Sequence, residues 1–439
     1  MQLTIDEALT RGGAGAFQKR LLGIFGLVWA ADAMQVIAVG FAAASLASTF
    51  GLSIPEALQT GTIFFLGMFA GAWLFGRLAD RIGRRNVLML TVACDAIFGI
   101  ASAFAGNFEL LLILRFLTGA AVGGTLPVDY AMMAEFLPPK NRGRWLVFLE
   151  GFWAVGTIVI ALTAWIASSM GIKEAWRVIY FVAAVPAVIG IFLRLWVPES
   201  PMYLLRRRRE PDAREVMNAV LAENGAERLP DDARLILPAP DKGVEKGGIF
   251  APILRSRTIA ILLVWLLVSV SYYGIFIWMP LRLASEGFGF VRGYGFLVLV
   301  ALAQIPGYAL AAWGVERYGR KPTLQAFLIL SAAGCFLFTL TYSPILIATS
   351  MLLMSFALLG TWGALYAFTP ELYPTRLRGT GMGTASAMAR LGGLAAPTIV
   401  ARVVEQGFGL AIGMFAACLV AGAVALMLVK TETKGRVLG

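Results

Sequence analysis

The sequence contains no histidine and only three cysteines, and charged residues make up only 14% of its 439 residues. Without histidine, the side chain that most often titrates near neutral pH, a proton carrier within the membrane has to be a carboxyl group. Cys94, Cys335 and Cys418 fall in apolar segments, so we expect packing residues and no disulfide framework. No nucleophile, metal cluster or phosphate loop occurs at a recognisable spacing. The sequence therefore predicts no enzyme, no catalytic residue, no metal site and no cofactor.

Long apolar runs are what the chain has in abundance. Hydrophobic residues account for 59% of the sequence and the mean hydropathy is +0.77, far above what a water-soluble surface allows. A helix needs about 20 apolar residues to cross a ~30 Å hydrocarbon core. Twelve such runs lie at 20–47, 57–78, 86–106, 109–134, 144–170, 176–197, 257–281, 292–314, 323–342, 345–369, 380–403 and 409–429. We expect an all-α, polytopic membrane protein with twelve transmembrane helices.

The formal net charge of +11 is distributed unevenly along the chain. Lys and Arg are concentrated in the loops after even-numbered runs, whereas the opposite loops hold few, chiefly Lys173, Arg282, Arg292 and Arg402. Such an excess marks the cytoplasmic side of a membrane protein. We therefore expect both termini in the cytoplasm, and we interpret the basic run at 206–209 as an anchor at the lipid surface. A nucleic-acid partner is not expected.

Two charged loop motifs occur twice with the same offset. The motif around Asp80 recurs around Glu316, and the motif around Glu135 recurs around Glu371, and both offsets are 236 (316 − 80 and 371 − 135). One offset for two motifs predicts a tandem duplication whose halves are related by an axis along the membrane normal. The expected organisation is a cytoplasmic N-terminus (1–19), an N-terminal six-helix bundle (20–204), a cytoplasmic linker (205–252), a C-terminal six-helix bundle (253–430) and a cytoplasmic tail (431–439).

Charged side chains of the repeated motifs can pair at the membrane boundary, where an unpaired charge is costly. We expect networks that hold the cytoplasmic ends together and break when the two halves rock. Static anchoring of the loops is the alternative. The candidate gating residues are Asp80, Arg81, Arg84, Arg85, Glu135, Arg142, Glu316, Arg317, Arg320, Glu371 and Arg378.

These motifs resemble those of the major facilitator superfamily along nearly the whole chain. The loop Asp80-Arg-Ile-Gly-Arg-Arg85 is similar to the signature of that superfamily. Glu135-x6-Arg142, Pro198-Glu-Ser-Pro201 and Glu432-Thr-Lys-Gly435 resemble the branch shared by sugar porters, organic ion transporters, synaptic-vesicle-2-like proteins and bacterial niacin permeases. The resemblance implies a secondary transporter that works by alternating access.

The sequence departs from the sugar porters of that branch. Those proteins carry a glutamine pair and an asparagine ahead of a Tyr-Tyr pair in the seventh helix, and a glutamine in the fifth. Here Tyr272-Tyr273 is present, but the glutamine pair falls on Leu262-Leu263, the asparagine on Val268, and Glu150 replaces the fifth-helix glutamine. A hydroxyl-rich ligand needs many polar partners, so a sugar is disfavoured.

Arg390 lies near the middle of the eleventh run. It resembles an arginine of the organic anion transporters that is implicated in holding the substrate anion, whereas organic cation transporters carry an aspartate at that position. A guanidinium at this depth needs a partner or a wet cavity. The resemblance implies a substrate carboxylate as partner, in bidentate contact. A structural arginine bonded to carbonyl groups is the alternative. Aromatic residues on the fifth, seventh and tenth runs suit a flat ring. The candidate substrate-binding residues are Arg390, Tyr366, Glu150, Tyr272, Tyr273, Trp278, Trp362 and Trp153.

Asp32 on the first run and Arg115 on the fourth both lie in or near the middle of the bilayer, where neither can remain unpaired cheaply. In proton-coupled members of the resembled branch, an aspartate on the first helix faces an arginine on the fourth. The resemblance therefore implies that Asp32 and Arg115 couple transport to protons. A constitutive ion pair in a uniporter is the alternative.

Two further acids share a depth near the cytoplasmic boundary. Asp129 and Glu150 could share a proton if they face one cavity, so Asp129 is a third proton-coupling candidate. The alternative is that Asp129 caps a bend near Pro127, while Glu150 pairs with Arg144 or Arg177.

We therefore expect a proton-coupled symporter that imports a small organic anion, an aromatic monocarboxylate such as nicotinate or benzoate, across a bacterial inner membrane. The alternatives are a uniporter or exporter of a neutral or cationic small molecule, or a sugar porter. The expected partners are the substrate, protons and the lipid bilayer, and we expect a monomer.

Overall fold

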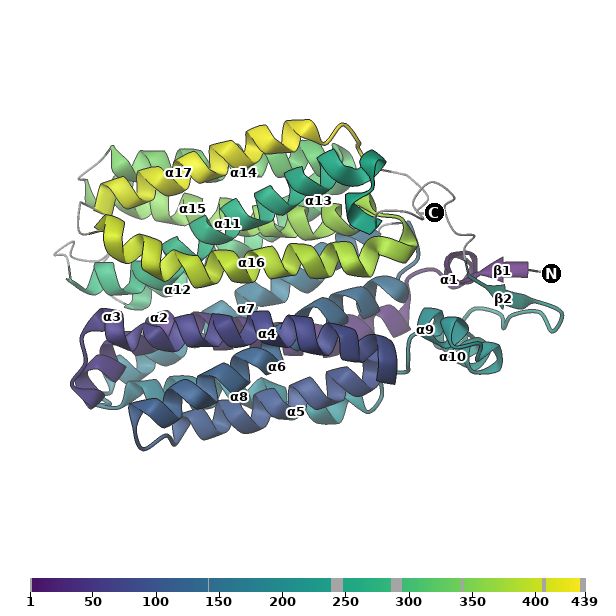
Figure 1. Cartoon of the computed structure of the whole chain (residues 1–439), viewed down its shortest axis with the longest axis horizontal. Helices are drawn as coiled ribbons and strands as arrows, with labels where there is room; N and C mark the ends of the chain where they lie inside the picture. Colours follow the sequence, from purple (N-terminus) through teal and green to yellow (C-terminus); the bar gives the residue numbers. More distant parts are fainter. Residues whose placement is uncertain are drawn as a thin grey trace.

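The computed structural model consists of long helices in two groups that lie side by side (Figure 1). It describes residues 2–140, 142–237, 248–285, 294–340, 343–404 and 408–434. The first group contains α2 (Ala16–Phe50), α4 (Gln59–Ile82), α5 (Arg84–Ala103), α6 (Phe108–Glu135), α7 (Arg142–Ser169) and α8 (Ala175–Arg194). The second contains α11 (Pro252–Ser285), α12 (Tyr294–Leu302), α13 (Gln304–Arg317), α14 (Arg320–Thr339), α15 (Pro344–Phe368), α16 (Thr375–Val404) and α17 (Phe408–Ala425).

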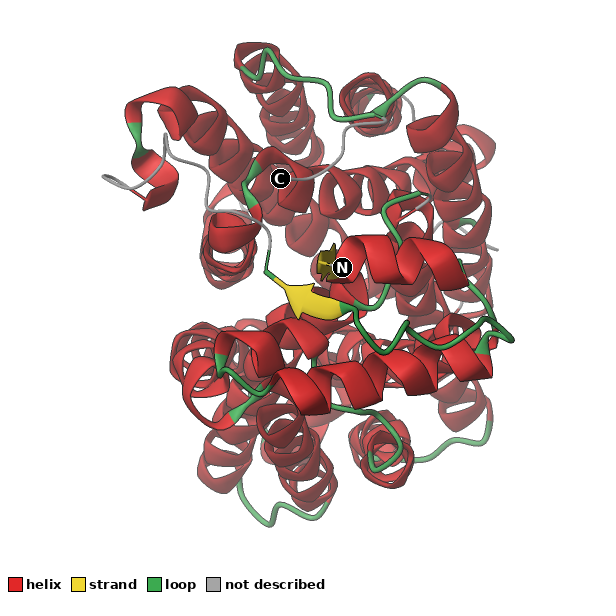
Figure 2. Cartoon of the chain, turned by 90° about the vertical axis from the view of Figure 1, so that its right-hand side faces the viewer, coloured by secondary structure: helices red, strands yellow, loops and turns green. Residues whose placement is uncertain are grey.

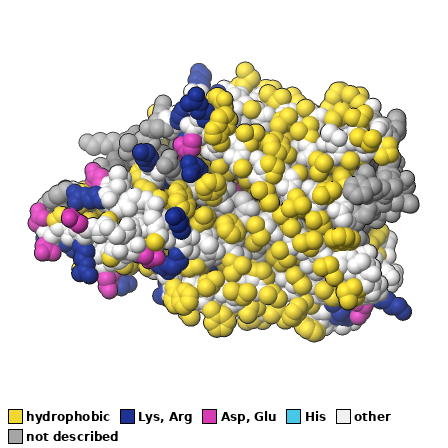
Figure 3. All heavy atoms as spheres, turned by 180° about the vertical axis from the view of Figure 1, so that it is seen from behind, with side chains coloured by type: hydrophobic (Ala, Val, Ile, Leu, Met, Phe, Trp, Pro, Cys, Tyr) yellow, Lys and Arg dark blue, Asp and Glu magenta, His cyan; other side chains and the backbone are white. Residues whose placement is uncertain are grey.

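The outer surface of this bundle is apolar along most of its length. Within the described residues, eleven helices are long and apolar enough to cross a membrane, with α12 and α13 counted as one. The helix α16 runs beside them over a similar length and completes the twelve predicted spans (Figure 1). Large apolar side chains such as Trp73, Phe192 and Ile345 are more than half exposed. A broad apolar band covers the rear face, and charged side chains gather at its ends (Figure 3). The all-α, polytopic fold is as predicted.

The predicted span at 292–314 is not one continuous helix. It is interrupted at Ala303, between α12 and α13. Pro306 lies four residues after Leu302, and a proline lacks the N–H that would bond to the carbonyl four residues earlier and clashes with it. The interruption therefore follows from Pro306.

Close helix packing in the first group depends on glycine. A Cβ atom on Gly71 of α4 would overlap the backbone of Ala120 on α6, and one on Gly123 of α6 would overlap the backbone of Met68. Small residues at such positions let helix backbones approach closely, which is how membrane helices gain packing energy.

Short elements gather at the end of the bundle that carries both termini, here called the terminal end (Figures 1 and 2). The opposite end is called the distal end. The strand β1 (Gln2–Thr4) pairs in parallel with β2 (Arg234–Ile236). The helix α10 (Glu210–Glu223) lies within the predicted linker, 205–252. The other short elements at this end are α1 (Ile5–Gly12), α9 (Pro201–Arg206), η1 (Gly248–Phe250), η3 (Thr369–Leu372) and η4 (Leu426–Leu428), whereas α3 (Ile54–Ala57) lies at the distal end (Figure 1).

Candidate functional site

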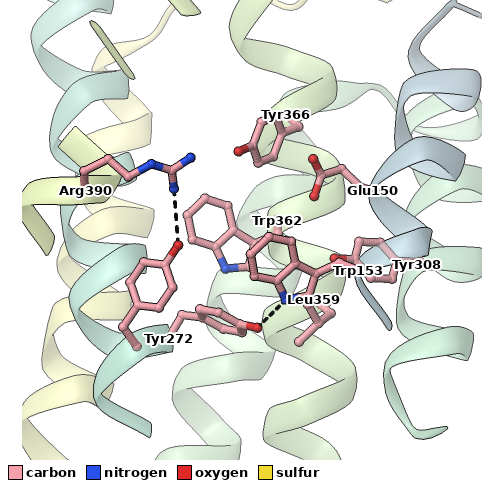
Figure 4. A pocket seen from close by; sticks show the side chains of 9 residues that line it. Glu150, Trp153, Tyr272, Tyr308, Leu359, Trp362, Tyr366 and Arg390 are labelled. Carbon is pink, nitrogen blue, oxygen red and sulfur yellow. Dashed lines mark hydrogen bonds between the residues drawn. The ribbon is translucent and has the colours of Figure 1, made fainter. Parts of the chain in front are cut away.

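A cavity with about 290 Å³ of empty space lies between the two helix groups, here called the central pocket (Figure 4). Side chains from α7, α11, α13, α15 and α16 form its walls. The lining residues are Glu150, Trp153, Tyr272, Tyr273, Tyr308, Leu359, Trp362, Tyr366 and Arg390.

The central pocket brings together seven of the eight residues that the sequence predicts for substrate binding. The side chain of the eighth, Trp278, lies outside the described residues. Tyr308 and Leu359 were not predicted. Tyr308 follows the helix interruption at Ala303 by five residues, and a proline-broken span with a tyrosine beside it is a sequence signal that points to this wall.

Four of the six aromatic rings that line the central pocket come from α11 and α15. Trp362 and Tyr366 are four residues apart on α15, so both point from one helix face toward the pocket, and their ring centroids lie 5.9 Å apart. Tyr272 packs edge-on against Trp362 at 5.8 Å. Such an arrangement offers flat apolar surfaces with polar ring tips, which suits a small planar ring.

Arg390 carries the only positive charge among the residues that line the central pocket. It is halfway along α16 and only 2% exposed. Its Nη1 donates one long hydrogen bond, 3.4 Å, to the Tyr273 hydroxyl, whereas Nε and Nη2 form no hydrogen bond of normal geometry in the described part of the chain, although the Tyr366 hydroxyl lies near the guanidinium. A buried guanidinium with two unbonded donors is costly unless an anion meets it. Figure 4 shows the guanidinium pointing into the pocket.

Glu150 lies across the central pocket from Arg390 (Figure 4). It is 2% exposed, and its Oε1 has no hydrogen-bond partner among the described residues. The expected alternative partners are engaged elsewhere, because Arg177 binds Glu174 at 3.0 Å and Arg144 lies over the Phe148 ring. The prediction that Glu150 pairs with Arg144 or Arg177 is therefore wrong.

Ring contacts between the helix groups close the central pocket along the bundle. On its terminal side, Tyr366 of α15 packs against Trp29 of α2 at 5.8 Å and Tyr130 of α6 at 4.9 Å. On its distal side, Nε1 of Trp153 donates a 2.7 Å hydrogen bond to the Tyr272 hydroxyl across the two groups. The structure therefore holds the pocket closed toward both ends at these positions.

Asp129 does not share a cavity with Glu150, so that prediction is wrong. Its carboxylate accepts two hydrogen bonds from Nη2 of Arg194, at 2.6 and 2.5 Å, and both side chains are buried between α6 and α8. Because an oppositely charged partner within α8 neutralises it, Asp129 lacks the freedom expected of a proton carrier. Arg194 was missed because it ends its span, where an arginine normally reaches the lipid surface.

Arg115 does not pair with Asp32, which corrects the predicted ion pair. Its Nη1 and Nη2 donate to the side-chain and backbone oxygens of Gln35, at 2.7 and 2.8 Å. Gln35 follows Asp32 by three residues on α2, so the guanidinium reaches the neighbouring turn. Both Asp32 oxygens are buried without a hydrogen-bond partner in the described structure, and one oxygen of the nearby Asp95 on α5 is also unbonded.

The repeated motifs form two networks with the same wiring at the terminal end. In the first group, Glu135 binds Arg84 and accepts a hydrogen bond from the Ser200 hydroxyl. In the second, Glu371 binds Arg320 at 2.9 Å and accepts a hydrogen bond from Thr433 at 2.5 Å.

An additional acid caps a helix in each network. The Glu199 carboxylate accepts from the backbone N–H of Arg85 at the start of α5, and Glu432 does so from Arg320 and Lys321 at the start of α14. Burial raises the pKa of Glu199 above its ordinary value, although backbone N–H groups oppose that shift. Sequence reasoning listed both acids only within family motifs and missed their capping role.

Several predicted gating residues make other contacts. Arg142 binds Asp6 of α1 at 2.7 Å and not Glu135. Its Nε and Nη2 also donate to the Leu137 carbonyl, and these bonds hold the guanidinium on the side of α1. Arg378 donates to the Pro370 carbonyl, and Nη2 of Arg85 donates to the Leu195 carbonyl.

The remaining gating candidates lie close to these contacts. The backbone carbonyls of Arg81 and Arg317 accept from Arg207 and Lys434. Glu316 joins Arg320 at 3.3 Å, and the Asp80 side chain lies outside the described residues.

Comparison with known proteins places this architecture in a family. The sequence model of the Major Facilitator Superfamily matches residues 24–397 and 291–437. The chain belongs to the major facilitator superfamily. It is 35% identical over 427 residues to the niacin transporter NiaP of Acinetobacter baylyi, covering 97% of this chain and 96% of that one. It is 30% identical to the synaptic vesicle 2-related protein of Xenopus laevis, over 98% of this chain and 81% of that one.

Among solved structures, the proton:xylose symporter XylE bound to 6-bromo-6-deoxy-D-glucose superposes with a TM-score of 0.81 at 20% identity, covering 96% of this chain and 98% of that one. At that identity the likeness establishes the fold. This member of the major facilitator superfamily is thus a multi-pass membrane transporter of a small molecule, and it is not an enzyme.

Proposed function

We propose that this protein is a proton-coupled symporter of a small aromatic monocarboxylate, with nicotinate as its substrate. The observation that carries the proposal is Arg390, a buried guanidinium with two unbonded donors surrounded by aromatic rings. A carboxylate would accept both donors in a bidentate contact, while its ring would lie against Trp362 and Tyr366. The relationship to the Acinetobacter baylyi niacin transporter supports the same substrate.

Polar groups opposite Arg390 favour nicotinate over benzoate. The Tyr308 hydroxyl, Nε1 of Trp362 and Oε1 of Glu150 are buried without hydrogen-bond partners among the described residues. The ring nitrogen of nicotinate could accept a hydrogen bond from the Tyr308 hydroxyl or from Nε1 of Trp362, whereas benzoate offers only C–H groups there. A site with polar groups that one ligand satisfies and another leaves unpaired discriminates strongly between them.

The terminal end would face the cytoplasm of a bacterial inner membrane. This orientation follows from the excess of Lys and Arg in the loops at that end. Substrate would then enter from the distal end and leave at the terminal end as the two helix groups rock about the central pocket.

The two terminal networks would steady the seam between the halves. Both close within their own helix group, but a Cβ on Gly143 at the start of α7 would lie 2.9 Å from Nη2 of Arg320. Glu371 thus positions Arg320 against the other half. Opening the terminal end would separate Gly143 from Arg320 while leaving each network intact.

Asp32 is our candidate for the proton carrier. Its carboxyl group is 1% exposed and its oxygens have no hydrogen-bond partner among the described residues, while Gln35 holds Arg115 away from it. An anion in that position would be costly, so the closed state suits the protonated acid. A state in which Arg115 leaves Gln35 for Asp32 would favour release of the proton.

Proteoliposome uptake tests the proposal directly. We expect purified protein to accumulate labelled nicotinate under an inward proton gradient, and Arg390→Met to weaken nicotinate binding by at least ~30-fold, since a buried charged pair is lost. Arg144→Met, on α7 but outside the central pocket, is the matched control. Uptake that ignores the gradient would indicate a uniporter, and unchanged affinity in Arg390→Met, or preferential binding of an amine or a sugar, would overturn the substrate assignment.

A further inference from the structure

A second cavity lies between the two helix groups, here called the distal cavity. It contains about 300 Å³ of empty space and no charged side chain lines it among the described residues. Its walls come from α2, α7, α11, α12 and α13. Apolar side chains such as Phe41, Phe276 and Val300 form most of the wall, with Thr157 and Gln304 as its polar members.

The distal cavity lies one helical turn beyond the central pocket on three helices. Thr157 follows Trp153 by four residues on α7, and Phe276 follows Tyr272 by four residues on α11. On α13, which runs in the opposite direction, Gln304 precedes Tyr308 by four residues. Four residues of helix rise by about 6 Å. The two cavities are therefore stacked along the bundle, with the distal one farther from the termini.

A hydrogen-bonded aromatic pair separates the two cavities. Nε1 of Trp153 and the Tyr272 hydroxyl are 2.7 Å apart, and the dashed line in Figure 4 marks this bond. The Tyr272 ring also packs on Phe276 at 4.9 Å, so the pair is supported from the distal side. This partition divides the space between the halves into two compartments with different chemistry.

Gln304 is the polar group that the distal cavity leaves without a partner. It is fully buried, and neither its amide nitrogen nor its amide oxygen forms a hydrogen bond in the described part of the chain. Its neighbours do not compete for it, since the Thr157 hydroxyl donates to the Trp153 carbonyl of its own helix at 3.0 Å. A buried amide without hydrogen bonds destabilises the protein, so a ligand that bonds to both Gln304 atoms would gain binding energy there.

We propose that the distal cavity is a second ligand-binding site, selective for a small neutral aromatic ring that carries a primary carboxamide. A carboxamide presents a donor and an acceptor side by side, as Gln304 does, so the two amides can form a pair of hydrogen bonds. The ring then lies against the apolar wall. A carboxylate is excluded because it would bring an uncompensated charge next to an amide that offers no cation.

Binding of benzamide tests this site without depending on the nicotinate proposal. With the full chain in lipid nanodiscs, equilibrium dialysis should detect benzamide binding with a Kd of about 1 mM or tighter. Gln304→Leu should weaken that binding at least ~10-fold, because it removes both hydrogen bonds. Ala301→Phe, which fills the cavity and keeps Gln304, should do the same. Thr163→Val, on α7 outside both cavities, is the control for folding, and thermal unfolding is recorded for every variant.

The location of bound benzamide distinguishes the two cavities. We expect Arg390→Met to retain benzamide binding and benzoate to leave it unchanged. If benzamide fails to bind at about 20 mM, or binds Gln304→Leu and Ala301→Phe as tightly as the original protein, the distal site does not exist. If benzoate displaces benzamide competitively and Arg390→Met loses it, benzamide occupies the central pocket and the proposal is wrong. Benzamide binding that depends on Gln304 stands even if nicotinate proves not to be transported.

Discussion

The two helix groups share a fold and a repeated sequence motif but differ in the charges they bury. Away from the terminal end, the first group buries four acids and two arginines among its described residues: Asp32, Asp95, Asp129, Glu150, Arg115 and Arg194. Among the side chains of the second group that the structure describes, one charged residue is buried there, Arg390, and aromatic rings surround it. Buried charge is costly in a membrane, so each group retains what its task requires.

This difference indicates a division of labour. The second group supplies the cation and most of the aromatic wall of the central pocket, which under the proposed function would hold the aromatic anion. The first group supplies the carboxyl groups of Asp32 and Asp95, which under the proposed function would be available to carry a proton. Glu150 of α7 is the point of contact between the two sets, because it faces the central pocket across from Arg390.

The largest expected effect of a single substitution concerns Asp32, and it tests the role proposed for the first group. Because a fixed amide cannot gain and lose a proton, Asp32→Asn should abolish accumulation of nicotinate under a proton gradient. Exchange of labelled for unlabelled substrate needs no net proton movement and should persist. Uptake and counterflow in proteoliposomes at several external pH values measure both. Accumulation that survives in Asp32→Asn would move the carrier to another acid, with Asp95 next because its carboxylate lies nearby.

The buried charges also show how far the sequence leads. A residue's position along its span gives its depth, and with the family resemblance that was enough to place Arg390, Trp362 and Tyr366 around one cavity. Depth does not give the direction in which a side chain points, because each helical residue turns by about 100°. Arg115 therefore reaches Gln35, one turn from its predicted partner, and this choice rests on the rotation and approach of two helices that no local pattern encodes.

The same limit explains the partner of Asp129, and breaking that pair should have the largest effect on stability. Asp129→Asn would leave Arg194 as an uncompensated buried cation, so we expect about 3–5 kcal/mol of destabilisation. Replacing both residues, as Asp129→Leu with Arg194→Met, should recover part of the loss. The exposed pair of Arg209 and Asp212 provides the control, and Asp212→Asn should leave stability almost unchanged. Thermal or denaturant unfolding in detergent measures each. A double variant less stable than Asp129→Asn would contradict this account.

Replacing Trp362 tests how much the second group contributes to substrate binding. Trp362→Leu keeps an apolar side chain but removes the flat surface beside Tyr366, so nicotinate should bind about 10-fold more weakly. Trp313→Leu is the matched control, because Trp313 is half exposed on α13, lies outside the central pocket and packs its ring against Tyr318. Isothermal titration measures both variants. Equal affinities in the two would mean that the ring does not lie against Trp362.

The smallest expected effect concerns the two terminal networks. It tests whether they contribute equally to stability although the two helix groups bury different charges. Ser200 donates to Glu135 in the first group, and Thr433 donates to Glu371 in the second. Removing either hydroxyl takes one hydrogen bond from a carboxylate that keeps its arginine, so Ser200→Ala and Thr433→Val should each cost about 1–2 kcal/mol. Thr433→Ser retains the hydroxyl and should stay within ~0.5 kcal/mol of the original protein. Because neither residue reaches the central pocket, nicotinate affinity should remain within a few-fold, and only the transport rate should change. If one variant lost several times more stability than the other, the two networks would not be equivalent. We would then expect the network of the second group to matter more, because its Arg320 lies against Gly143 of the first group.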